Sequence, residues 1–93
     1  MAAEVFIDDD PGFLDWRDAH PDGFIVNAGR KPTADYLMLH RTGCSFMHLP
    51  VAPGRWTRDF RKVCAGTAEE LADWAKLEVA EYRGLKPCHY CKP

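Results

Sequence analysis

The spacing of apolar side chains along this chain predicts short strands in its middle and a helix near its end. Residues 24–27 (Phe-Ile-Val-Asn) form a short apolar run of the kind that becomes a strand. In residues 36–40 apolar side chains occur at both odd and even positions, so both faces of this strand are mostly apolar and we expect it to be central. A third strand is expected over residues 60–64.

Two helices are predicted in addition to the strands. The clearer one covers residues 67–80, because Thr67 and Glu70 match a capping box, in which each side chain satisfies a backbone amide at the helix start. Apolar residues then recur at helical spacing, at positions 68, 71, 72, 75 and 79. Gly84 is expected just after the end of this helix.

The other helix is short and lies near the start of the chain. We expect Asp10 to be its N-cap and Pro11 its first helical residue, and we expect it to stop before the His20-Pro21 turn. Residues 28–33 are interpreted as a loop. The fold class is therefore α+β, with a small antiparallel sheet of about three strands and two helices.

Length and composition narrow the class of protein. The 93 residues allow a single domain, residues 1–93, with a core so modest that a bound metal would add useful stability. No apolar run approaches 18 residues, which argues against a membrane-spanning helix, and residues 1–10 lack the basic and apolar stretches of a secretory signal. We therefore expect a cytoplasmic protein with no membrane partner.

Charge is unevenly distributed along the chain. Residues 1–18 carry six acidic side chains against Arg17, a balance of −5, and residues 28–62 carry seven basic side chains against two acidic ones, a balance of +5. The net charge of −2 argues against sequence-blind binding of nucleic acid over the whole surface. The basic side chains of residues 28–62 either form one basic face or pair with the acidic side chains of residues 1–18.

Two short Cys and His pairs have the spacing of metal ligands. His40 and Cys44 leave the second predicted strand, and Cys88 and Cys91 form a Cys-x-x-Cys pair in the C-terminal tail. Zinc prefers four Cys or His ligands in tetrahedral geometry, so Zn²⁺ bound by both pairs would staple the C-terminal tail to the strand end. Cys64 could replace His40 as the fourth ligand, or it could be a small buried residue.

The same cysteines have other possible chemistry. A disulfide between Cys88 and Cys91 would suit an oxidising compartment, for which the sequence shows no export signal. A redox Cys-x-x-Cys normally begins a helix after a strand, whereas this pair follows the predicted helix. The metal site is therefore the favoured interpretation.

The second half of the chain resembles a known family. After the predicted capped helix, residues 84–91 read Gly-Leu-Lys-Pro-Cys-His-Tyr-Cys, which is similar to the ending of the small zinc-binding domain of Ada-type DNA-repair methyltransferases and related zinc modules. The resemblance covers about 60 residues, from Tyr36 to Pro93, and is most specific in the last ten. It leaves the first 35 residues unexplained.

This resemblance implies a ligand set and a limit on the chemistry. The implied zinc ligands are His40, Cys44, Cys88 and Cys91. In the repair domain the first ligand of the first pair is a cysteine that accepts a methyl group from damaged DNA, and the matching position here is His40. Because an imidazole cannot replace that thiolate, the resemblance implies a structural zinc and a DNA-related accessory module rather than a repair enzyme.

One basic segment is a candidate surface for DNA or RNA. Its basic side chains could bind phosphates and its tryptophan could stack on an unpaired base; the residues are Arg55, Trp56, Arg58, Arg61 and Lys62. The competing interpretation places the aromatic residues of this segment in the core and its bases at the rim.

Two other classes of function remain as alternatives. A zinc-stabilised adaptor that binds a protein partner would fit the near-neutral charge. An enzyme would need a nucleophile, such as Cys44 or Cys64 beside His48, but these residues have simpler structural interpretations. Because no phosphate-binding loop or serine nucleophile motif is present, we do not expect an enzyme.

Overall fold

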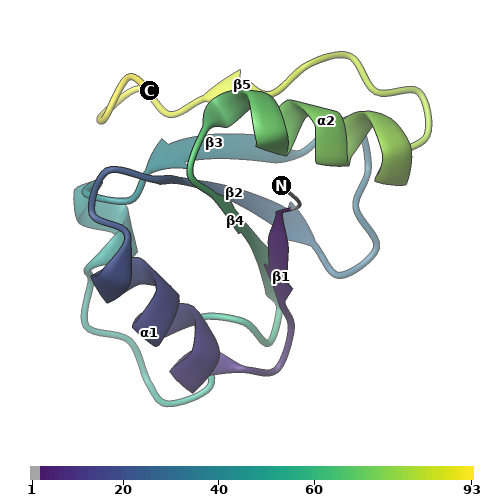
Figure 1. Ribbon diagram of the computed structural model, residues 1–93. Coiled ribbons are helices and arrows are strands. Elements are labelled where there is room, and N and C mark those ends of the chain that lie inside the picture. The colour runs from purple at the N-terminus through teal and green to yellow at the C-terminus, as the bar shows by residue number, and fades with distance from the viewer. Residues whose placement is uncertain (1–2) are drawn as a thin grey trace.

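The computed structural model describes residues 3–93, and in this part of the chain a five-stranded sheet lies between two α-helices (Figure 1). The elements are β1 (Glu4–Phe6), α1 (Asp10–Ala19), β2 (Phe24–Gly29), β3 (Leu37–Arg41), the 3-10 helix η1 (Ser45–Met47), β4 (Phe60–Ala65), α2 (Ala68–Glu78) and β5 (Lys86–Pro87). The strand order is β1-β4-β2-β3-β5. The first four strands of this order pair antiparallel, and β5 pairs parallel with β3.

The α+β class and the two helices are confirmed, and so are the three expected strands, which are β2, β3 and β4. The sheet itself differs from the prediction, because it has five strands in residues 3–93 and is mixed rather than purely antiparallel. The two unforeseen strands, β1 and β5, are three and two residues long. Segments this short have no detectable periodicity, and they become strands only because the free edges of β4 and β3 supply their partners.

The face of the sheet covered by α2 is apolar throughout. Side chains from β2, β3 and β4 meet one face of the helix in a core of Val26, Ala28, Leu37, Leu39, Val63, Ala65, Leu71, Ala75 and Val79. Leu71 and Ala75 are fully buried, as the helical spacing predicts, and Trp74 packs against the edge of this core. Burial of these apolar side chains stabilises the packing of α2 on the sheet. None of the candidate metal ligands is among them.

The opposite face, covered by α1 and η1, combines apolar and chemically active residues. Phe13 and Trp16 of α1 pack on Ile25 and Met47, and this cluster also contains Cys44, Cys64 and Cys88. Alternation along β3 places Leu37 and Leu39 on the α2 face and His40 on this one. The candidate metal ligands therefore gather on the α1 side of the sheet.

The start of α1 differs from the prediction by one residue. Asp9 is the N-cap, since its carboxylate accepts from the backbone amide of Gly12, and Asp10 is the first helical residue. The Asp10 carboxylate instead accepts hydrogen bonds from the amides of Trp56 and Thr57 and from the Thr57 hydroxyl, at 2.6–3.1 Å. Either aspartate could cap the helix. Because Thr57 binds the Asp10 carboxylate, Asp9 is the residue that caps it.

Two element boundaries and one capping contact also differ from the prediction. β2 continues through Ala28 and Gly29, which we expected in a loop, because these residues pair with β3 and β4. Thr67 caps α2 as predicted, but its hydroxyl donates to Glu70 Oε1, so the glutamate meets the hydroxyl rather than the Thr67 amide. The helix ends at Glu78, so Gly84, at φ 110°, belongs to the following loop rather than to the helix terminus.

None of the helices formed by residues 3–93 is long and apolar enough to cross a membrane.

β3 lies between two neighbours, as expected, but β2 is the middle strand of the order. The position of β3 beside the two-residue β5 is what matters for the metal centre described below.

The Asp10 contacts generate a stability prediction. Asp10→Asn places an amide donor where the carboxylate accepts, so we expect the free energy of unfolding to fall by about 1–2 kcal/mol in urea titrations. Asp9→Asn is the matched control, because asparagine caps helices as well as aspartate does. Equal stability of Asp10→Asn and the parent chain would contradict the proposed role of these contacts.

The same contacts predict the pH dependence. Burial raises the pKa of Asp10, but its hydrogen bonds with Thr57 and Trp56 outweigh burial, and the net pKa lies below the ordinary value of 3.8. A carboxylate with a lowered folded-state pKa stabilises the fold above its unfolded pKa and loses that contribution as the pH falls through the folded value. The acid limb of the stability profile should therefore be shallower in Asp10→Asn.

Candidate metal centre

The end of β3 and the turn after it supply two of the four candidate ligands. His40 is the fourth residue of β3 and is buried, with 7% of its surface exposed. Beyond Arg41 the chain turns tightly, with the Cys44 amide donating to the Arg41 carbonyl at 3.0 Å. The Cys44 carbonyl then accepts from the amide of Met47, which holds η1 directly after this ligand.

The C-terminal tail supplies the other two ligands. β5 runs parallel to β3, with Lys86 beside Met38 and Pro87 beside Leu39. The amide of Cys88 continues this pairing by donating to the Leu39 carbonyl at 2.9 Å. The Lys92 amide donates to the Cys88 carbonyl at 3.0 Å, which closes a turn around the Cys-x-x-Cys pair and directs Cys91 back toward the strand end.

Arg41 contributes to this centre, a role that the sequence analysis did not predict. Its backbone amide donates to the Cys91 sulfur at 3.3 Å, and its guanidinium donates to the carbonyls of Cys91 and Lys92 at 3.1 and 3.2 Å. Fifty residues separate Arg41 from Cys91, so no local pattern could have linked them. One residue thus binds the tail through both its backbone and its side chain.

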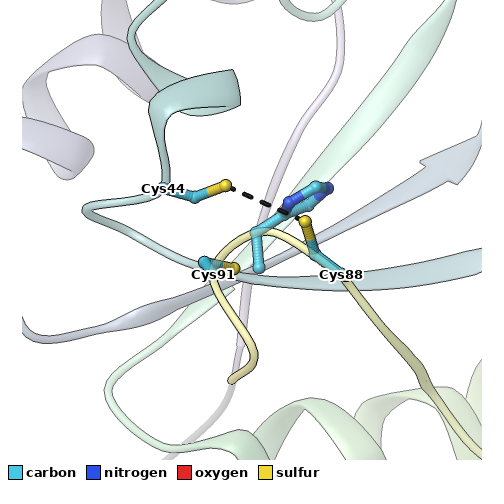
Figure 2. A group of neighbouring side chains, drawn as sticks. Cys44, Cys88 and Cys91 are labelled. Atoms are coloured by element: carbon cyan, nitrogen blue, oxygen red, sulfur yellow. Dashed lines mark hydrogen bonds between the residues drawn. The ribbon is translucent and has the colours of Figure 1, made fainter.

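The four ligand atoms converge. One atom each from His40, Cys44, Cys88 and Cys91 lies within 4.8 Å of the other three. Figure 2 shows the sulfur atoms of Cys44 and Cys88 pointing toward each other, and they are 4.0 Å apart. Tetrahedral zinc with a Zn–S bond of 2.3 Å would place two sulfurs about 3.8 Å apart. These residues are therefore positioned to hold a metal ion.

The protonation chemistry of His40 agrees with a ligand role. Its Nδ1 atom is buried and has no hydrogen-bond partner among residues 3–93, a costly state that coordination would relieve. Burial, and secondarily the charge of Lys62, lowers the pKa of His40 below its usual value. The imidazole is therefore held neutral, which is the form that binds metals.

Burial and backbone amides shift the pKa values of two of the thiols in opposite directions. Burial, opposed by an amide hydrogen bond at Phe46, raises the pKa of Cys44 to about 11. Burial also acts to raise the pKa of Cys88, but the backbone amides of Cys91 and Tyr90 outweigh it, and the net shift is downward. Sulfurs packed this closely repel one another when ionised, and a bound metal ion removes that penalty.

Cys64 is not a member of the cluster, which closes an alternative that the sequence left open. Ile25 of β2 pairs with His40 on one side and with Cys64 on the other. A whole strand therefore lies between His40 and Cys64, a separation of about 9–10 Å. Cys64 is 1% exposed, and burial raises the pKa of its thiol. It is a small core residue.

The basic segment predicted to contact nucleic acid does not form one continuous surface. Lys62 is only 6% exposed; its ammonium donates to Asn27 Oδ1 at 2.6 Å, and burial lowers its pKa to about 8. Trp56 is half-buried against Phe13, with ring centroids 5.5 Å apart. Arg55 and Arg58 are exposed. The nucleic-acid role of this segment stays a prediction.

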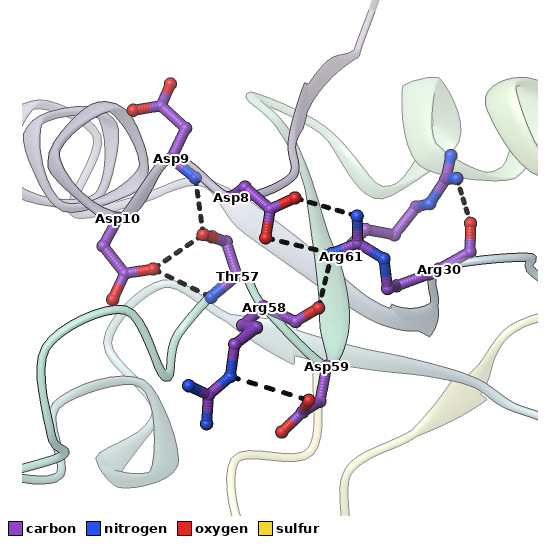
Figure 3. A network of polar contacts seen from close by, with 8 residues as sticks. All are labelled: Asp8, Asp9, Asp10, Arg30, Thr57, Arg58, Asp59 and Arg61. Atoms are coloured by element: carbon purple, nitrogen blue, oxygen red, sulfur yellow. Dashed lines mark hydrogen bonds and ion pairs between the residues drawn. The ribbon is translucent and has the colours of Figure 1, made fainter.

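Several arginine side chains of the basic middle form ion pairs or hydrogen bonds within the protein (Figure 3). Arg30 forms an ion pair with Asp8 at 2.8 Å and donates to the Arg58 carbonyl. Arg61 donates to the Arg30 carbonyl, and Arg58 lies 3.8 Å from Asp59. The second interpretation of the charge pattern, pairing of the basic middle with the acidic start, is thus confirmed for the pair of Arg30 and Asp8.

A cavity of about 310 Å³ opens beside the centre. It is lined by Pro21, Asp22, Gly23, Arg41, Gly43, Cys44 and Cys91. Cys91 is the one ligand of the four that is only half-buried. Cys44 and Cys91 thus both border the cavity, and Cys91 is the more exposed of the two.

Comparisons of the chain with protein-family models, with curated proteins and with solved structures find no match. The resemblance to Ada-type domains therefore stays a prediction from the ligand spacing and the C-terminal motif. The case for a metal centre depends on the converging side chains alone.

The geometry predicts which substitutions abolish metal binding. Cys88→Ser and His40→Ala should each weaken binding of Co²⁺ by about 100-fold or more, because each removes one of four ligands. Absorption of Co²⁺ reports both thiolate ligation and tetrahedral geometry, so one titration measures affinity and coordination. Cys64→Ala is the matched control and should bind Co²⁺ like the parent chain; loss of binding in this variant would contradict the assignment.

Proposed function

We propose that this chain is a structural zinc module. The observation that carries the proposal is the convergence of one imidazole and three thiols within 4.8 Å. Soft thiolates with one imidazole in a four-ligand site favour zinc, whereas calcium and magnesium prefer oxygen ligands. A site with four protein ligands has no coordination position left for a substrate, so the role is architectural rather than catalytic.

The proposed mechanism is closure of a long loop. Zinc joins His40 and Cys44, at the end of β3, to Cys88 and Cys91 in the tail. β5 is an exposed two-residue strand with little stability of its own, so the metal would contribute most of the free energy that holds the tail on the sheet. Binding of zinc by the folded state alone stabilises that state by mass action.

We further propose that the module is a DNA-related accessory protein that binds nucleic acid. Its support is the segregation of charge, because residues 36–58 include no acidic side chain, and neither do residues 82–93. These two segments carry the metal ligands, and Asp22, from outside them, is the acidic residue of the cavity beside Cys91. A local excess of positive charge favours binding of phosphate even when the net charge of the chain is −2.

A zinc-stabilised adaptor for a protein partner is the second candidate. The observation that favours it is the exposure of apolar side chains in the loop after η1, where Leu49 is 47% and Val51 41% exposed. Exposed apolar groups of this kind suit a protein interface better than a nucleic-acid backbone.

The zinc proposal predicts the metal content and the effect of chelation. Protein purified under reducing conditions should contain one zinc ion per chain by elemental analysis. Chelation should lower the thermal unfolding midpoint and speed hydrogen exchange of the Cys88 and Lys92 amides more than that of the Leu71 and Ala75 amides. Protein without zinc, or a tail that is equally protected after chelation, would contradict the proposal.

The nucleic-acid proposal predicts salt-dependent binding. The zinc-loaded chain should bind labelled oligonucleotides at 50 mM salt and more weakly at 200 mM, because bound cations are released as phosphates are contacted. Fluorescence anisotropy measures both affinities. Binding that is absent at low salt would exclude nucleic acid as the partner and favour the adaptor function.

A further inference from the structure

An exposed aromatic pair lies beside the metal centre. The rings of Phe46 and Tyr90 meet edge to face, with centroids 4.9 Å apart at an angle of 76°. Phe46 is 39% and Tyr90 76% exposed. Phe46 follows Cys44 by two residues and Tyr90 lies between Cys88 and Cys91, so the two ligand-bearing segments bring the rings together. Phe46 thus supports Tyr90 from one side and leaves most of it open to a ligand.

Cationic groups belong to the same ligand-bearing segments as this pair. Arg41 is exposed and reaches across the tail to the carbonyls of Cys91 and Lys92, and Lys92 itself is exposed. Arg41 also lines the cavity beside Cys91, where Asp22 is the acidic residue of the lining. The ligand-bearing segments, residues 36–58 and 82–93, contain no acidic side chain, which favours an anionic ligand at this face.

We propose that this face binds single-stranded nucleic acid, with a base stacked on Tyr90 and adjacent phosphates near Arg41 and Lys92. The inference rests on the proposed nucleic-acid function and gives it a location and a substrate class. Aromatic side chains beside basic ones suit single strands, because an unpaired base offers a flat π-face while the backbone offers negative charge. A duplex keeps its bases stacked and offers this site only its phosphates.

The basic segment at residues 55–62 is a poorer location. Arg55 and Arg58 both lie near Asp59, at 4.0 and 3.8 Å, and Trp56 is packed on Phe13. The exposed ring of that segment is Phe60, which is 44% exposed and packs on Tyr36 with centroids 5.6 Å apart. The segment is the poorer location because its two exposed arginines share the acidic neighbour Asp59. It also leads into the far end of the sheet, since Phe60 pairs with Gly29 whereas Arg41 pairs with Phe24, a distance along β2 of about 17 Å.

The test uses the zinc-loaded full chain and four fluorescein-labelled probes of about 12 nucleotides, a length within the usual site size of such proteins. They are a mixed-sequence DNA strand, the same sequence as RNA, the blunt DNA duplex, and a strand of abasic nucleotides that keeps only the backbone. We expect the two base-bearing single strands to bind more tightly than the duplex or the abasic strand. The DNA and RNA arms show which sugar the site prefers.

Tyr90→Ala should weaken single-strand binding by about 5- to 100-fold, which is the usual effect of losing one stacked base. Tyr90→Phe should keep the parent affinity, because it keeps the ring. The abasic strand should bind Tyr90→Ala and the parent chain equally, since it has no base to stack. Lys92→Gln should weaken all strands and lower the salt slope by about 1.

Two further variants and a zinc measurement test whether a loss of affinity in Tyr90→Ala has a cause other than the lost base stacking. Leu77→Ala removes another highly exposed apolar side chain, on α2, and should leave the affinity unchanged. The zinc content of every variant is measured, so that an effect of Tyr90→Ala is not mistaken for loss of the neighbouring ligands. The double variant Arg55→Gln/Arg58→Gln removes the competing site without touching the metal centre.

The outcomes separate this inference from the proposed function. Single-strand binding that is lost in the Arg55 and Arg58 double variant and unchanged in Tyr90→Ala would overturn the inference and leave nucleic-acid binding standing. Equal binding of duplex and single strand, with no effect of Tyr90→Ala, would also overturn it. Failure to bind any probe would reject both proposals and point to a protein partner.

Discussion

The pairing of the C-terminal tail with β3 is the interaction on which the rest of the metal centre depends. The hydrogen bond from the Cys88 amide to the Leu39 carbonyl places Cys88 beside His40, and the Arg41 amide bonds the Cys91 sulfur from the same strand. The four ligands converge only because these backbone contacts exist. A two-residue strand has little stability alone, so a metal ion held by these four ligands would stabilise the strand pairing, and the pairing would in turn hold the ligands in place.

The two faces of the sheet explain why the site lies where it does. The face under α2 is filled by apolar side chains and leaves no room for a polar group without a large cost. On the other face the ten-residue α1 shares the core with residues from the turn at Cys44, from η1, from the tail and from the loop that contains Trp56. Polar and sulfur-bearing side chains such as His40, Cys44 and Cys88 can be buried there because they can satisfy one another through a metal.

The parts that the sequence predicts are those with local causes. The Thr67 cap, the apolar stripe of α2 and the cores of β2, β3 and β4 follow from spacing within a few residues, and the pairs of ligands follow from metal-binding spacing. The other features have distant causes. β1 and β5 need the edges of β4 and β3, Asp10 is diverted from capping by Thr57, and the buried Lys62 has its hydrogen-bond partner in Asn27 of β2.

The charge pattern shows how a linear count can mislead about a surface. Residues 28–62 have a balance of +5, yet Lys62 is buried, and Arg30 and Arg61 are directed to Asp8 and to backbone carbonyls. A basic side chain that is already satisfied within the fold gains little by meeting a phosphate, because it must first give up its partner. The segments that bear the metal ligands have fewer charges but no acids. Arg41 is also bonded to backbone carbonyls, those of Cys91 and Lys92, so it must likewise give up partners to meet a phosphate. The difference between the two locations is therefore the absence of acidic side chains from the ligand-bearing segments, which favours an anionic ligand at the metal end.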